Sequence, residues 1–121
     1  MTTSDVTMPV RRRDGAAVID LQGDVNGRAE HSLNAAWEEA TRTTPDAVVL
    51  NFETAGYINS TGIALIVGLL AMARARGISI RAYGLTPHYR EIFEITRLAD
   101  FLAINPDEDS AVRGAEGATH A

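Results

Sequence analysis

Two adjacent hydroxyl side chains stand where this chain is predicted to pass from a strand into a helix. Ser60 and Thr61 lie within the polar run Asn59-Ser60-Thr61-Gly62. Residues 47–52 are apolar and β-branched, as in a strand buried on both faces, and residues 63–73 are typical of an apolar helix. In open α/β sheets functional sites form at the carboxyl ends of strands, so this junction is the candidate site.

A hydroxyl at the start of a helix can take either of two roles. The first backbone N–H groups of a helix have no partner within it, and the helix dipole is positive there. Ser60 can therefore cap the helix, which contributes about 1 kcal/mol, or carry a phosphate, whose charge the helix end stabilises. The residues alone leave both roles open. Thr61 is interpreted as a structural or secondary hydroxyl. Gly62 is small either for helix packing or to leave the surface beside Ser60 open.

The order of the elements predicts a mainly parallel α/β fold. Strands are predicted at residues 6–13, 17–21, 47–52, 78–83 and 101–104, and helices at residues 28–41, 60–77, 86–96 and from 106 onward. Residues 22–27 are predicted to form a loop. Because the strand–helix–strand spacing is that of a right-handed parallel crossover, we expect a four- or five-stranded sheet with helices packed against it. Residues 6–113 form the expected single domain, between a disordered N-terminus at 1–5 and a flexible C-terminal tail at 114–121.

Individual side chains have predicted positions within these elements. Trp37 lies on the apolar face of the first helix and is expected in the core, and Asn26 is expected to cap that helix. The helix at 86–96 is expected to bury Ile92, Phe93 and Ile95.

Two polar segments near the chain ends also have predicted roles. The triplet Arg11-Arg12-Arg13 is either a solvated edge that discourages unwanted strand pairing or a patch for a partner. Asn105 is expected to cap the last short helix, whose first turn is acidic.

Composition narrows the classes of function. The chain has 121 residues, of which 45% are apolar, and this suits one globular domain. A formal net charge of -5 argues against binding to nucleic acid or to an anionic membrane surface. Cysteine is absent, so the chain has no disulfide, no thiolate metal site and no cysteine nucleophile, in keeping with a cytoplasmic protein.

The sequence gives little support to an enzyme. The three histidines, His31, His88 and His120, have no metal-ligand spacing and no nucleophile elbow beside them. A phosphoaspartate receiver is the nearer rival, since its fold is also parallel α/β. It needs an aspartate at the end of the central strand, where this chain has Asn51 and, as its only acid, Glu53. We therefore expect no catalytic residue, no metal and no cofactor.

The polar run followed by an apolar helix resembles the Asp-Ser-Ser/Thr-Gly motif of STAS domains, above all that of the bacterial anti-sigma factor antagonists. The similarity extends over residues 18–104. Two positions differ from the family pattern. Asn59 stands where the family usually has aspartate, and Gly23-Asp24-Val25-Asn26 stands where it has Gly-x-Leu-Asp, so that Asn26 replaces a second aspartate.

The resemblance implies a protein switch. In that family the first serine of the motif, here Ser60, is phosphorylated by a partner kinase that is itself the anti-sigma factor. The unphosphorylated antagonist binds this partner and frees the sigma factor, and the phosphorylated form loses affinity. ATP and magnesium belong to the partner, and a phosphoserine phosphatase is a further expected partner. The antagonist itself is expected to be a monomer or weak homodimer. The expected partner-binding residues are Asp24, Asn26, Asn59, Ser60, Thr61 and Gly62. The alternative is a STAS scaffold subunit of a stress-signalling or lipid-transport complex without a working phospho-switch.

Overall fold

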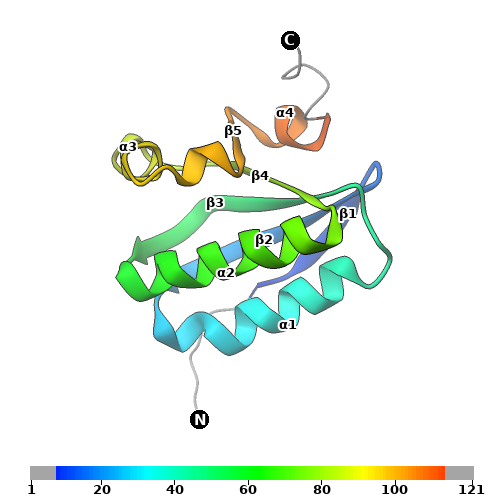
Figure 1. Cartoon of the computed structure of the whole chain (residues 1–121), viewed down its shortest axis with the longest axis horizontal. Coiled ribbons are helices and arrows are strands. Elements are labelled where there is room, and N and C mark those ends of the chain that lie inside the picture. Colours follow the sequence, from blue (N-terminus) through cyan, green and yellow to red (C-terminus); the bar gives the residue numbers. More distant parts are fainter. Residues whose placement is uncertain (1–7, 114–121) are drawn as a thin grey trace.

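A five-stranded sheet forms the centre of the computed structural model, which describes residues 8–113 (Figure 1). The predicted disorder at 1–5 and the predicted tail at 114–121 lie outside these residues. The strands are β1 (Val10–Arg13), β2 (Ala16–Val25), β3 (Ala47–Ile58), β4 (Ser79–Tyr83) and β5 (Ala103–Asn105), and they lie in this order across the sheet. β1 runs antiparallel to β2 and all other neighbours are parallel, which confirms the predicted sheet.

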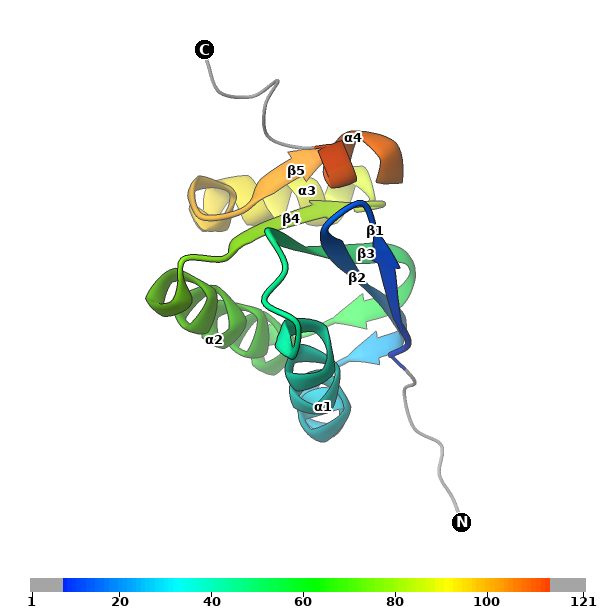
Figure 2. The same ribbon diagram turned by 90° about the vertical axis from the view of Figure 1, so that its right-hand side faces the viewer.

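Helices cover both faces of this sheet. They are α1 (Glu30–Thr41), α2 (Ser60–Arg76), α3 (Pro87–Ile95) and α4 (Glu108–Arg113), with 3-10 turns η1 (Gly27–Ala29) and η2 (Leu98–Asp100). Figure 2 shows α1 and α2 side by side under one face, with α4 on the opposite face. The sheet is therefore the middle of three layers.

The larger core lies between the sheet and the helices α1, α2 and α3. Strand residues alternate between the two faces, so Leu50 and Phe52 of β3 both point into this core. Trp37 is 3% exposed and is confirmed as a core residue. Phe93 of α3 meets Phe52 edge to face, with ring centroids 5.9 Å apart. The predicted burial of Ile95 is wrong: it is 71% exposed, because a residue two places after Phe93 points to the far side of the helix.

The opposite face of the sheet is held by ion pairs to α4. Arg11 donates to both carboxylate oxygens of Asp20, at 2.7 and 2.8 Å, and to both of Glu108, at 3.0 and 2.9 Å. Arg13 and the Tyr83 hydroxyl also donate to Glu108, at 2.8 and 2.7 Å. The arginine triplet lies on the partly exposed edge strand, as one interpretation expected, but Arg11 and Arg13 also bind the first turn of α4, which neither interpretation included. Their neighbour Arg12 points the other way and donates to two carbonyl oxygens near the end of α1.

Several element boundaries differ from the predictions. β2 runs to Val25 through the expected loop at 22–27, because β2 and β3 stay paired beyond the predicted end of β3, with two register shifts. Strand pairing thus overrides the local preference of Gly23 and Asp24 for a loop. β1 begins at Val10 and β5 at Ala103, so both are shorter than predicted. Gly77, in contrast, ends α2 in the left-handed conformation that a helix C-terminus favours.

The cap of the last helix is also corrected. α4 begins at Glu108, and the Asp107 carboxylate accepts a hydrogen bond from the Ser110 N–H at 2.8 Å. Asp107 therefore takes the capping role that was expected of Asn105, which is the last residue of β5.

The Glu108 ion pairs predict how stability depends on pH. Hydrogen bonds from Arg11 and Arg13 lower the pKa of Glu108 from 4.5 to about 2. A carboxylate whose pKa is depressed in the folded state adds stability above its unfolded pKa and loses that contribution as the pH falls through its folded pKa. We expect Glu108→Gln to lower the free energy of unfolding at pH 7 by about 2 kcal/mol. The difference from the native protein should shrink between pH 4.5 and about 2.

Denaturant melts of both proteins across this pH range measure that difference. Glu38→Gln, at an exposed glutamate of α1, is the control and should change stability by less than about 0.5 kcal/mol at any pH. A Glu108→Gln deficit that stays constant down to pH 2 contradicts the role given to the carboxylate charge.

Candidate functional site at the junction of β3 and α2

Ser60 is the first residue of α2, and its hydroxyl does not cap the helix. The capping role belongs to its neighbour: Asn59 has extended backbone angles, and its side-chain oxygen accepts from the Gly62 N–H at 2.8 Å. Ser60 is exposed, and within the described part of the chain its hydroxyl makes no hydrogen bond. Of the two roles left open by the sequence, the structure assigns capping to Asn59 and leaves Ser60 available to solvent.

The backbone that leads to Ser60 is fixed by three consecutive amides. The Tyr57 N–H donates to the Asp24 carboxylate at 2.9 Å, and the Asn59 N–H donates to the Val25 carbonyl oxygen at 3.2 Å. Between them, the Ile58 N–H donates to the Tyr89 hydroxyl of α3 at 3.0 Å. Two bonds therefore come from the end of β2 and one from α3, so the strand end is held from both sides.

Gly62 allows the first turn of α2 to lie directly on the end of β2. A Cβ atom added to Gly62 would lie 2.0 Å from the carbonyl oxygen of Val25, which belongs to the backbone and cannot rotate away. Gly62 is also buried. Of the two reasons considered for a glycine here, helix packing is the one that the structure supports.

The residues predicted to bind a partner gather at one end of the molecule. In Figure 1 the arrowhead of β3 and the first turn of α2 lie together at this end. Asn26 caps η1, the turn before α1, by accepting from the Arg28 N–H at 2.9 Å. Thr61 is exposed, and its methyl group faces Gly27 across the junction. Asp24, Asn59 and Ser60 are exposed as well, whereas Gly62 contributes only through the close packing it permits. Partner binding by the set stays a prediction.

Tyr89 is the residue of this site that sequence reasoning missed. It lies 31 positions after Ile58, in a helix whose sequence gives no sign of a role at the junction. Its preceding cap was recognisable, since Thr86 and Pro87 at the start of α3 are typical helix-starting residues. The direction of the phenol follows only from how α3 packs on β3.

Asp20 of β2 is engaged in structure. Asp20 is buried, and the guanidinium of Arg11 holds the pKa of its carboxyl below the usual value. Asn51 donates to the same carboxylate at 2.8 Å. Asp20 therefore serves as an ion-pair partner on the α4 face, while Glu53, the acid near the end of the central strand, is exposed. Across residues 8–113, no three His, Cys, Asp or Glu side chains gather closely enough to bind a metal ion.

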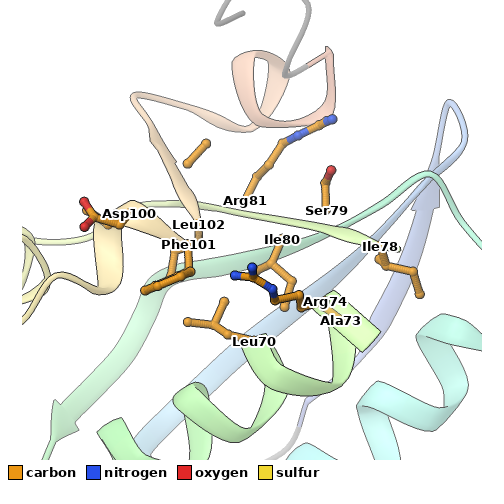
Figure 3. Close-up of a pocket in the computed structure, with 12 residues that line it drawn as sticks. Leu70, Ala73, Arg74, Ile78, Ser79, Ile80, Arg81, Asp100, Phe101 and Leu102 are labelled. Carbon is orange, nitrogen blue, oxygen red and sulfur yellow. The ribbon is translucent and has the colours of Figure 1, made fainter. Parts of the chain in front are cut away.

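A separate open groove of about 480 Å³ lies at the other end of α2 (Figure 3). Leu70, Ile80 and Leu102 form its apolar floor, and the guanidinium of Arg74 lies 5.9 Å from the centre of the exposed Phe101 ring. Ser60 and its neighbours are not among the lining residues, so the groove is distinct from the junction.

None of the helices within residues 8–113 combines the length and apolar character that crossing a membrane requires.

Known proteins with the same domain bear out the resemblance. The family model of the STAS domain matches residues 7–111. Over 109 residues the chain is 21% identical to the anti-sigma-F factor antagonist RsfA of Mycobacterium tuberculosis. The matched region covers 85% of this chain and 82% of the relative. An anti-sigma factor antagonist from Mycobacterium paratuberculosis has a similar structure, with a TM-score of 0.73 at 20% identity, covering 90% of this chain and 92% of the other.

A third relative has been solved in a modified state. The Bacillus cell fate determinant SpoIIAA in its phosphorylated form gives a TM-score of 0.68 at 19% identity, covering 90% of this chain and all of the other. At such identities the two solved structures establish the shared fold, which is the one that the motif predicted.

The packing at Gly62 generates a paired mutational prediction within one helix. Gly62→Ala should lower the free energy of unfolding by about 3 kcal/mol, because its Cβ meets the Val25 carbonyl and α2 must shift. Gly68→Ala should raise it by up to about 1 kcal/mol, because open space surrounds this site and alanine favours a helix. Denaturant midpoints of the two variants measure this opposition of sign. An equal gain from both would show that β2 and α2 are not in close contact at Gly62.

Proposed function

The chain belongs to the STAS domain family, and from this premise we propose that it is an anti-sigma factor antagonist switched by phosphorylation of Ser60. In its unphosphorylated form it binds a cognate anti-sigma factor and so releases a sigma factor. The same anti-sigma factor, acting as a serine kinase with its own ATP and magnesium, transfers a phosphate to Ser60 and is then released. A phosphoserine phosphatase restores the active form, and we propose that the cycle runs in the cytoplasm.

The observation that carries this proposal is the free, exposed hydroxyl of Ser60 beside a separate cap. Since Asn59 already satisfies the Gly62 N–H, a kinase can modify Ser60 without removing a hydrogen bond from the fold. A phosphate adds a charge of about -1.5 to -2 at a helix start, where the dipole is favourable. Asparagine at position 59 adds no negative charge beside it.

The proposed partner surface combines the junction with the exposed side of α2. Asn59, Ser60 and Thr61 are exposed, and the same side of the helix continues through Ala64 and Val67. A partner that packs on these small and apolar side chains would enclose Ser60. A dianionic phosphate in such an interface loses its water without gaining a matching cation, so phosphorylation weakens the complex.

We predict that Ser60 is the sole phosphate acceptor. The experiment incubates the chain with its cognate anti-sigma kinase and ATP and reads the intact mass. One added phosphate is expected for the native chain and for Thr61→Ala, and none for Ser60→Ala. Thr61 is the matched control because it is also an exposed hydroxyl, one residue further along α2. Mapping of the phosphate to Thr61 would overturn the assignment.

We also predict that charge at position 60 controls binding. Ser60→Ala should bind the unmodified anti-sigma factor about as tightly as the native chain, while Ser60→Asp should bind at least about tenfold more weakly because its carboxylate is desolvated in the interface. Calorimetry of the two variants measures the difference. Equal affinities would favour the alternative, a STAS scaffold subunit without a working phospho-switch.

A further inference from the structure

We propose that Tyr89 is a positioning residue for Ser60: its hydroxyl ties α3 to the end of β3 and so holds Ser60 in the geometry that a kinase recognises. The inference rests on the proposed modification of Ser60. It adds that Tyr89, and through it α3, influences how readily Ser60 is modified. Its physical basis is the hydrogen bond from the Ile58 N–H to the Tyr89 hydroxyl, 3.0 Å long.

The Tyr89 hydroxyl replaces a missing strand. β4 pairs with β3 only as far as Tyr83 opposite Asn51, so the last residues of β3 have β2 on one side and no strand on the other. A buried N–H without a partner is costly, and Ile58 is buried. The phenol of Tyr89 accepts this N–H from the side that β4 has left open. It therefore completes the backbone bonding two residues before Ser60.

The position of the Tyr89 hydroxyl is fixed by the way α3 is anchored. Four residues further along this helix, Phe93 is fully buried and meets the Phe52 ring edge to face. At the helix start, the Thr86 side chain accepts from the Tyr89 N–H at 3.3 Å. The crevice between Tyr89 and β3 has a volume of only about 30 Å³. Removing the hydroxyl there leaves the Ile58 N–H without its protein partner.

Because of this hydrogen bond, the position of Ser60 depends on the position of α3. Asp24 and Val25 hold the Tyr57 and Asn59 amides from the β2 side, and Tyr89 is the counterpart from α3. When the Tyr89 bond is lost, the strand end is held from one side only, and the fraction of molecules with Ser60 correctly placed falls. A substrate that is competent for only part of the time shows a correspondingly higher apparent KM, while its rate at saturation is preserved.

The test compares Tyr89→Phe with Tyr83→Phe. Both variants remove one phenolic hydroxyl that makes one hydrogen bond, but the Tyr83 hydroxyl binds Glu108 on the opposite face of the sheet. In Tyr89→Phe, hydrogen exchange of the Ile58 amide, read by NMR, should speed up about threefold to tenfold, as expected for one lost hydrogen bond. The KM of the cognate anti-sigma kinase for the chain should rise by a similar factor, with kcat changed less than about twofold. Tyr83→Phe should leave both readouts at the native value.

The outcomes separate the two proposals. Unchanged exchange and unchanged KM in Tyr89→Phe overturn the positioning role, as does an equal change in Tyr83→Phe, which would show a loss of general stability. If the native chain takes no phosphate at Ser60, the proposed function fails. The Ile58 exchange rates then decide by themselves whether Tyr89 holds the junction.

Discussion

No side chain separates the first turn of α2 from the end of β2, and the geometry of the junction depends on this contact. Because Gly62 lies against the Val25 carbonyl, the helix starts directly beside the strand end. The same carbonyl accepts the Asn59 N–H, which sets Asn59 in the extended conformation of a cap. Once Asn59 is the cap, the next residue is at the outer surface with its hydroxyl unused. The exposure of Ser60 is thus a consequence of backbone packing two residues away.

The two faces of the sheet are stabilised by different physics. On the α2 face, burial of apolar side chains such as Leu50 and Phe93 fixes the helices that carry the junction. On the α4 face, a small apolar contact is combined with the ion pairs among Arg11, Asp20 and Glu108. Added salt or acid should therefore weaken the packing on the α4 face first, because the charged side chains there are partly exposed. The apolar core that holds the junction should be affected less.

The sequence predicted the architecture well because its signals are local. A continuous apolar run before the polar residues and another after them indicate a buried strand and a helix, whatever else the chain does. The sequence could not identify the capping residue, since Asn59, Ser60 and Thr61 all suit an N-cap and only the backbone path distinguishes them.

Partners that are distant along the chain could not be predicted, because the signals in the sequence are local. Arg11 meets Glu108 across 97 positions, and no pattern along the chain links the two. Tyr89 reaches the junction only through the packing of α3. At Gly23 and Asp24, turn-forming residues are carried into a strand because the neighbouring strand pairs with them. Local preference predicts elements, whereas tertiary contacts decide their ends and the partners of their charges.

Asn59 and Ser60 divide between them two tasks that one residue can also perform. The cap is a permanent part of the fold, and the neighbouring hydroxyl is free of it. A phosphate on Ser60 would therefore alter the surface while leaving the backbone hydrogen bonds at the start of α2 in place. Such a change needs no refolding step, so its speed would be set by the enzymes that add and remove the group. The protein would keep no memory of its earlier state once the phosphate was gone.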